Sequence, residues 1–210
     1  MSPVPRKRQH ARIRPYRPDD LDALYTICLE TGDAGEDATV LHDDLELRGH
    51  VFVAPYAVLE PELCFVVEDG PGVGGYIVGT FDTRAFEERA EREWWPALRE
   101  RYADPDPSRM SDWTADEAMA FLIHHPMTGD PAVVAEYPSH LHINLLPRLQ
   151  GRGLGARLMD TFLDALRARG SRGVHLGVSP RNEGGIAFYR RYGFDELTSN
   201  EFQIVFALRL

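Results

Sequence analysis

A short basic segment in the second half of the chain contains three glycines at alternate positions. They are Gly151, Gly153 and Gly155 in the stretch QGRGLG, which separates an apolar run from an amphipathic one. Glycine lets backbone N–H groups approach an anion without a Cβ clash, and the N-terminus of a following helix adds a positive dipole. Arg148 and Arg152 add charge-assisted donors. The segment therefore predicts a site for a phosphate or pyrophosphate.

Two common nucleotide-binding loops fit this segment poorly. A P-loop needs Lys and then Ser or Thr after its last glycine, where this chain has Ala156 and Arg157. A dinucleotide-binding loop has the spacing G-x-G-x-x-G and an acidic residue at the end of the next strand, where this chain has Val178 and Ser179. A glycine-bearing turn that only starts a helix remains an alternative.

A second motif lies one strand further along the chain. The stretch NEGGIAFYRRYGF, from Asn182 to Phe194, indicates a capped helix that ends at a glycine. Together with Q-x-x-G-x-G, from Gln150 to Gly155, it resembles the acetyl-CoA signature of the GNAT N-acetyltransferase superfamily. The opening IRPYRPDDLDALYTI is similar to the first strand and helix of that family. The segments TGDAGEDAT, WWPALRERY and SHLHINLLP further resemble bacterial relatives of the acetyltransferase-like domain of eukaryotic O-GlcNAcase.

The resemblance implies acetyl-CoA as the cofactor and CoA as a product. In this family the strand that enters the glycine loop separates from the next strand, and its backbone binds the pantetheine arm. The cofactor-binding residues that the resemblance implies are Leu145, Leu146, Arg148, Gln150, Gly151, Arg152, Gly153, Leu154, Gly155, Ala156, Asn182 and Tyr189. Asn182 would bind the pantetheine or a water molecule, act as a helix N-cap, or do both.

The resemblance also implies direct attack of a primary amine on the thioester, without an acyl-enzyme. Tyr189 occupies the position of the family's general acid, and a phenol (pKa ~10) and a thiol (pKa ~8.5) have similar acidity. His140 and His142 alternate with Asn144 on one face of a predicted strand, and an imidazole (pKa ~6.5) accepts a proton at neutral pH. Tyr189, His142 and His140 are the predicted catalytic residues; a purely structural role is the alternative for each.

Acidic side chains follow the first predicted helix, in the loop GDAGED. In the fold that the resemblance implies, this loop borders the acceptor site. Asp33, Glu36 and Asp37, with Asn144 on the strand, are therefore the predicted substrate-binding residues, which would bind an ammonium group or drain its proton through water. The alternative is a solvated acidic loop.

Two pairs of adjacent residues have less specific patterns. His124 and His125 have no Cys or carboxylate neighbour to complete a metal site, so no metal site is predicted. Trp94 and Trp95 are consistent with an acceptor pocket, a subunit interface or plain packing.

A mixed β-sheet is needed to bring these residues together. ELCFVVED and VGGYIVGTF flank the turn DGPG and predict an antiparallel hairpin, whereas SHLHINLLP and GVHLGVS predict strands on either side of a helix. A short helix is expected around 41–48, ended by Gly49. We predict one α/β, GNAT-like domain over 12–210, with a mixed twisted sheet flanked by helices. A helical insertion at about 84–126 lies between the third and fourth strands, and a flexible basic tail covers 1–11.

Composition excludes several partners. The 210 residues carry a net charge of −10, and the only dense basic run is Arg6-Lys7-Arg8, so no nucleic acid partner is expected. No window reaches the ~18 apolar residues of a membrane span, and the N-terminus lacks the apolar core of a signal peptide. The two cysteines lie in apolar runs, which favours a reducing, cytoplasmic setting. We expect a monomer or homodimer that acts on a small-molecule amine or on a peptide or protein amine.

These features predict an acetyl-CoA-dependent N-acetyltransferase with Tyr189 as general acid. The main alternative is a catalytically weak or inactive acetyltransferase-like module that binds CoA or a protein partner, because no obvious general base is present. Transfer of a longer acyl group is a third option.

Overall fold

The computed structural model describes residues 11–210; residues 1–10, nearly all of the predicted basic tail, lie outside the described part. The strands are β1 (Arg12–Pro15), β2 (Phe65–Asp69), β3 (Gly72–Thr80), β4 (Ser139–Leu145), β5 (Gly173–Val178), β6 (Asp195–Ser199) and β7 (Ile204–Arg209). The helices before β4 are α1 (Leu21–Glu30), α2 (Leu47–Phe52), α3 (Ala54–Leu59), α4 (Thr83–Glu93), α5 (Trp95–Arg101), α6 (Ala115–His124) and α7 (Pro131–Glu136). After β4 come α8 (Leu154–Ala168) and α9 (Glu183–Tyr192).

The strands form one 7-stranded sheet in the order β1-β2-β3-β4-β5-β7-β6. The predicted hairpin of β2 and β3 is confirmed, and β4 and β5 are parallel neighbours. Their pairing is limited to Ser139 with Val174 and His140 with His175. Beyond His140 the two strands separate, as the resemblance implied, and leave an opening in the middle of the sheet.

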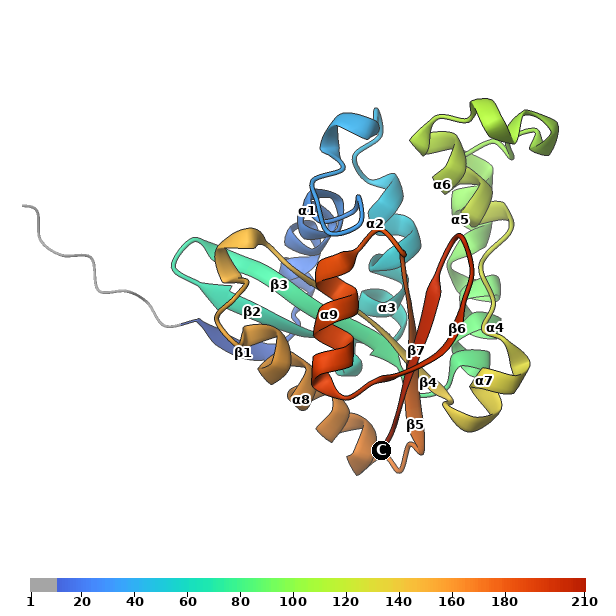
Figure 1. The fold of residues 1–210 in the computed structure, drawn as a ribbon. Helices are drawn as coiled ribbons and strands as arrows, with labels where there is room; N and C mark the ends of the chain where they lie inside the picture. The colour runs from blue at the N-terminus through green and yellow to red at the C-terminus, as the bar shows by residue number, and fades with distance from the viewer. Residues whose placement is uncertain (1–10) are drawn as a thin grey trace, which may run out of the picture.

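The two faces of the sheet bury different residues because side chains alternate along a strand. On β3, Tyr76 and Val78 pack with α1 to α6, whereas Ile77 packs with α8 and α9. Figure 1 shows α8 and α9 on one face of the sheet and α1, α2 and α3 on the other. The predicted fold class, a single α/β domain with a mixed sheet flanked by helices, is confirmed.

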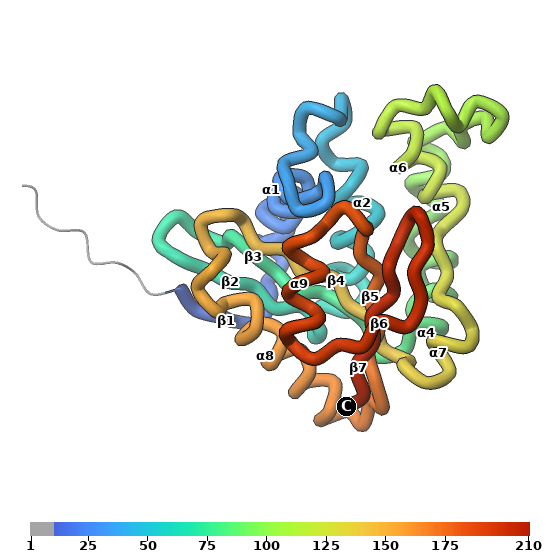
Figure 2. The backbone as a smooth tube through the Cα atoms, in the orientation of Figure 1, coloured from blue at the N-terminus to red at the C-terminus, as the bar shows by residue number. Residues whose placement is uncertain are grey.

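Helices α4 to α7 connect β3 to β4, where the helical insertion was predicted. In Figure 2 this green-to-yellow part of the backbone forms one side of the molecule, beside α2 and α3. Phe86, Trp95 and Ile123 of these helices share a hydrophobic cluster with α1, α2 and α3. Asp116 on α6 accepts hydrogen bonds from the backbone N–H groups of Asp43 and Asp44, each at 3.0 Å. The insertion is thus integrated into the core.

The prediction of a helix ending at Gly49 is wrong. The structure instead has a 3₁₀ turn at Thr39–Leu41, and α2 begins at Leu47 and continues through Gly49. A Cβ at Gly49 would lie 2.1 Å from a ring carbon of Tyr25 on α1. The glycine therefore allows two helices to pack closely, and it does not end one. The helix is instead interrupted at Val53, between α2 and α3, two residues before Pro55.

Candidate active site

The glycine loop connects β4 to α8 at the opening between β4 and β5. Gly151 and Gly153 have φ angles of +67° and +72°, and a Cβ on either would meet no atom within 4 Å. Their left-handed backbone therefore favours glycine while the space in front of them stays open. Gly155 has a different role: its Cβ would lie 3.3 Å from Leu145 and 3.4 Å from Phe188, so glycine brings α8 close to β4 and α9.

The start of α8 presents unpaired backbone donors. The first hydrogen bond of the helix runs from the N–H of Arg157 to the carbonyl of Gly153 at 3.2 Å, and Gly153 provides no side-chain cap. Within the described residues, the N–H groups from Gly151 to Ala156 therefore have no protein acceptor. Such a helix start, with its positive dipole, is suited to an anion.

The side chains that flank this loop divide into two kinds. Gln150 donates from Nε2 to the carbonyl of Leu145 at 2.8 Å and holds the loop against β4. Arg148 is turned away, with Nη2 3.3 Å from a carboxylate oxygen of Asp69. Arg152 is exposed and donates only to the carbonyl of Arg148, at 3.3 Å. Of the two arginines, Arg152 is therefore the one left near the loop for a phosphate.

The backbone groups at the open edge of β4 differ in whether they already have hydrogen-bond partners. Both backbone groups of Leu146 are occupied: its N–H donates to Gly74 O and its carbonyl accepts from Leu149 N, each at 2.9 Å. Backbone groups of alternate residues point to the same neighbouring strand, so Asn144 also faces β3. Ile143 and Leu145 consequently direct their backbone groups toward the opening. Ile143 was missed because side-chain types carry no information about main-chain contacts.

Tyr189 lies on α9 and points into the core on the α8 side of the sheet. Its side chain packs against the rings of Phe194 and Phe206, and 8% of the residue is exposed. Burial raises the pKa of Tyr189, so the phenol stays protonated. The only fully buried side-chain polar atoms without a partner in the described chain are His42 Nε2 and Arg48 Nε. The Tyr189 hydroxyl has no hydrogen-bond partner among the described residues and is not one of these two atoms, so it keeps some accessible surface.

The helix that carries Tyr189 is fixed at both ends. The Asn182 side chain accepts a hydrogen bond from Gly185 N at 2.8 Å, which confirms its role as N-cap. Gly193 ends the helix with φ +109°. Gly35, in the acidic loop, lies against Asn182, since a Cβ there would be 3.3 Å from its side-chain oxygen.

The acidic loop reaches the site, but two of its carboxylates are engaged. Asp33 forms an ion pair with Arg181, and Asp37 accepts hydrogen bonds from the N–H and hydroxyl of Thr39 at 2.8 and 2.6 Å. The backbone of Glu36 pairs with that of Asp33 to form the turn. Asn144 on β4 donates to the hydroxyl of Thr31 at 2.6 Å, at the end of α1. The loop, the β5–α9 turn and β4 are thus brought together.

The two strand histidines meet at one tyrosine. The Tyr56 hydroxyl lies 2.7 Å from His140 Nε2 and 3.2 Å from His142 Nε2. Thr83 donates its hydroxyl proton to Pro138 O, so it accepts from His140 Nδ1 at 2.8 Å. This order assigns the protons: Tyr56 donates to His140, and His142 Nε2–H donates to Tyr56.

These bonds leave His142 Nδ1 as the free nitrogen. The accessible surface of both histidines faces a cavity, and enclosure by protein lowers the pKa of His142 to about 4 and that of His140 well below its usual value. Both are therefore neutral at pH 7. The chain of bonds ends at the carbonyl of Pro138, which takes up no proton, so it orients His142 and does not conduct protons. Tyr56 and Thr83 were missed because they lie far from β4 in sequence.

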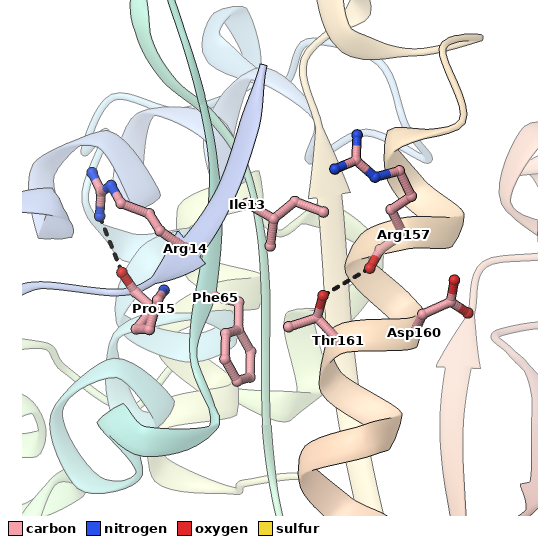
Figure 3. A pocket seen from close by; sticks show the side chains of 7 residues that line it. All are labelled: Ile13, Arg14, Pro15, Phe65, Arg157, Asp160 and Thr161. Carbon is pink, nitrogen blue, oxygen red and sulfur yellow. Dashed lines mark hydrogen bonds between the residues drawn. The ribbon is translucent and has the colours of Figure 1, made fainter. Parts of the chain in front are cut away.

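A cavity of about 340 Å³ lies beside these histidines, under the insertion. Trp95 contributes to its lining, whereas Trp94 donates from Nε1 to the carbonyl of His50 at 2.9 Å. A second, more open cavity of about 440 Å³ lies between β1, β2 and α8. Figure 3 shows its walls, with Arg14 on β1 and Arg157 on α8. None of the predicted site residues lines that second cavity.

The remaining candidates have structural partners. His124 bonds to the carbonyl of Tyr102 at 2.7 Å, and His125 lies 3.0 Å from a carboxylate oxygen of Asp104. Over 11–210 no cluster of His, Cys, Asp and Glu has the arrangement of a metal site. Among the described helices, none has the length and apolar character needed to cross a membrane.

Comparison with known proteins gives one family match. The model of the acetyltransferase (GNAT) family matches residues 76–194, from β3 to the end of α9. The Protein O-GlcNAcase of Rattus norvegicus is 28% identical over 190 residues, which are 90% of this chain and 20% of that protein. The chain therefore spans about a fifth of the length of this curated relative.

Solved structures have the same fold. The crystal structure of SsHAT superposes with a TM-score of 0.88 at 42% identity, covering 95% of this chain and 98% of that one. The structure of yncA from Salmonella typhimurium, solved with its cofactor acetyl-CoA, has a TM-score of 0.52 at 15% identity. It covers 96% of this chain and 93% of that one and supports the fold alone.

Proposed function

The chain belongs to the acetyltransferase (GNAT) family, and from this premise we propose that it transfers an acetyl group from acetyl-CoA to a primary amine. One observation carries the proposal. The unpaired N–H groups of the glycine loop lie beside the opening between β4 and β5, so an anion-binding loop and an open strand edge adjoin each other.

The loop and the strand edge have complementary roles in this proposal. The N–H groups from Gly151 to Ala156, with Arg152, hold the pyrophosphate. The backbone groups of Ile143 and the N–H of Leu145 hold the pantetheine arm and orient the acetyl carbonyl. Acetyl-CoA supplies the activated carbonyl as a thioester. The new bond joins the amine nitrogen to the acetyl carbon, and the bond from that carbon to sulfur breaks.

His142 is the proposed acceptor of the amine proton, at Nδ1. It is neutral, and its Nε2–H donates to Tyr56. It lies two residues before Asn144 on β4, so both side chains are on the same face of the strand. A pKa of about 4 makes it a weak base, so the amine must arrive as the free base. An amine nitrogen that has just formed a bond to carbon is far more acidic, and a weak base then suffices. His140 acts through Tyr56 as a positioning residue.

Tyr189 is the proposed donor to the departing sulfur. Its hydroxyl is accessible and protonated at any working pH. Burial raises its pKa above that of a free phenol, so complete proton transfer to sulfur is less favourable. We therefore expect Tyr189 to stabilise the developing thiolate by donating a hydrogen bond. The products are the acetylated amine and CoA.

Two measurements test the proposal in sequence. Calorimetric titration with acetyl-CoA and with CoA needs no knowledge of the acceptor, and we expect micromolar binding of both. Release of free thiol is then followed with a panel of amines that includes small amines, polyamines and peptides. Binding without thiol release for any amine would identify an inactive acetyltransferase-like module. Absence of binding by folded protein would contradict the assignment of the loop.

A further inference from the structure

The cavity under the insertion has an apolar wall. Phe52 on α2 and Tyr56 on α3 contribute to it, together with Phe86, Trp95 and Leu122 of the insertion. The rings of Tyr56 and Phe86 stack at 4.4 Å between centroids. Its volume of about 340 Å³ lies in the range of small-molecule sites, which is ~300–1,000 Å³. A wall of this kind favours an aromatic or branched aliphatic group.

The charge of the lining is negative. Glu87, Glu88 and Glu91 all line the cavity, and no lysine or arginine is among the described residues that do so. Glu87 and Glu91 have ion-pair partners on the same helices or the next, whereas the described chain offers Glu88 no ion pair. A carboxylate-bearing ligand would be repelled here.

The cavity reaches the proposed reaction centre through His142. This side chain lines the cavity and also occupies the face of β4 that continues to Asn144, next to the opening in the sheet. The ring of Phe52 lies 6.0 Å from that of His142. Arg48 stacks on Phe52 at 5.2 Å and lies against Gly32, and it does not line the cavity.

We propose that this cavity binds the body of the acceptor, and that the acceptor is a primary amine with an aromatic or branched aliphatic body and no carboxylate. The amine nitrogen lies at His142, and the body lies between Phe52 and Trp95. This inference rests on the proposed acetyl transfer for its functional meaning. The binding site itself, an apolar cavity with an acidic lining, does not depend on it.

Binding is measured first, because it is independent of turnover. The probes are 2-phenylethylamine, ethylamine and phenylalanine, titrated into the full chain with CoA present. We expect 2-phenylethylamine to bind about 10- to 100-fold more tightly than ethylamine, from burial of the ring, and phenylalanine to bind more weakly than 2-phenylethylamine. In turnover, the ratio of kcat/KM between the two amines, corrected for their free-base fractions, should show the same preference.

A matched pair of substitutions locates the site. Leu122→Trp fills the cavity, and Leu197→Trp makes the same change on the exposed strand β6, where 37% of the residue is exposed. The preference for 2-phenylethylamine should fall toward one in the first variant and persist in the second. Thermal unfolding checks that both are folded, and Trp95→Ala, which enlarges the cavity, should also weaken binding of the ring.

The outcomes separate the two proposals. Tight binding of 2-phenylethylamine that Leu122→Trp removes supports the cavity even if no acetyl transfer occurs, in which case the proposed function alone is wrong. Equal affinity for both amines, tighter binding of phenylalanine, or a preference that Leu122→Trp leaves intact would overturn the cavity proposal, whether or not acetyl transfer is observed.

Discussion

Two glycines with similar positive φ angles lie at opposite ends of α8, and substituting each in turn separates the effect of backbone strain from the effect on cofactor binding. Gly153 starts the helix with φ +72°, and Gly170 follows its end with φ +79°. A Cβ at either position would meet no atom within 4 Å. The 15 residues of the helix span about 22 Å, and the two glycines lie beyond its two ends, so they are farther apart than that. Gly153→Ala and Gly170→Ala should therefore cost the same stability and differ only in cofactor binding.

The magnitudes follow from this geometry. A non-glycine residue in the left-handed region costs about 1–2 kcal/mol. For a chain of this size, that corresponds to a fall in Tm of about 2–8 °C in both variants. At Gly153 the methyl group also enters the open space in front of the unpaired N–H groups. Loss of one hydrogen bond to a charged group costs about 1.5–3 kcal/mol, so affinity for acetyl-CoA should fall about 10- to 150-fold in Gly153→Ala alone.

The assay is calorimetric titration of acetyl-CoA into wild type and both variants, with thermal unfolding of each. Gly170→Ala should bind as wild type does while it unfolds at the same lowered temperature as Gly153→Ala. Equal affinity in the two variants would refute the placement of the pyrophosphate at this loop. Unequal stability would refute the argument that strain is the same at both ends.

Three further predictions concern the catalytic side chains. Tyr189→Phe should lower kcat about 100-fold or more and leave acetyl-CoA affinity unchanged in titration; unchanged turnover would remove Tyr189 from the mechanism. Tyr56→Phe keeps the ring stacked on Phe86 but leaves His140 Nε2 without its donor, so unfolding should become about 1–3 kcal/mol easier, with a fall in kcat; denaturant curves that match wild type would contradict the assigned bonds. Because the pKa of His142 is lowered to about 4 on folding, the unfolded chain binds more protons between that value and pH 6.5, and stability falls on acidification. His142 alone should contribute about 2 kcal/mol of that loss between pH 7.5 and 5, and denaturation of His142→Asn should show a smaller loss over this interval. An identical loss in that variant would mean that His142 is not held neutral.

The parts of the fold that were predictable from the sequence are local. The hairpin of β2 and β3 follows from a glycine-containing turn between two alternating strands. The start of α8 follows from glycines placed just before an amphipathic run, and the cap at Asn182 follows from its position before a helical run. In each case, residues close in sequence determine the conformation.

The parts that were not predictable depend on contacts between distant residues. Gly49 looks like a helix stop, and only the ring of Tyr25 on another helix explains it as a packing position. Tyr56 lies in an apolar stretch that indicates nothing beyond a buried helix, yet it joins His140 to His142. The N–H of Leu146 donates a hydrogen bond to Gly74 next to it in the sheet, and no pattern of side chains along the sequence predicts this contact.

The attachment of the insertion by Asp116 affects how this protein can change over evolution. The carboxylate of Asp116 binds the backbone of Asp43 and Asp44, and His42 Nδ1 lies 2.6 Å from it. The insertion and the N-terminal helices thus form one cooperative unit, and α4 to α6 are not an exchangeable cassette. A graft of these helices from a relative would have to bring its own partner for that loop.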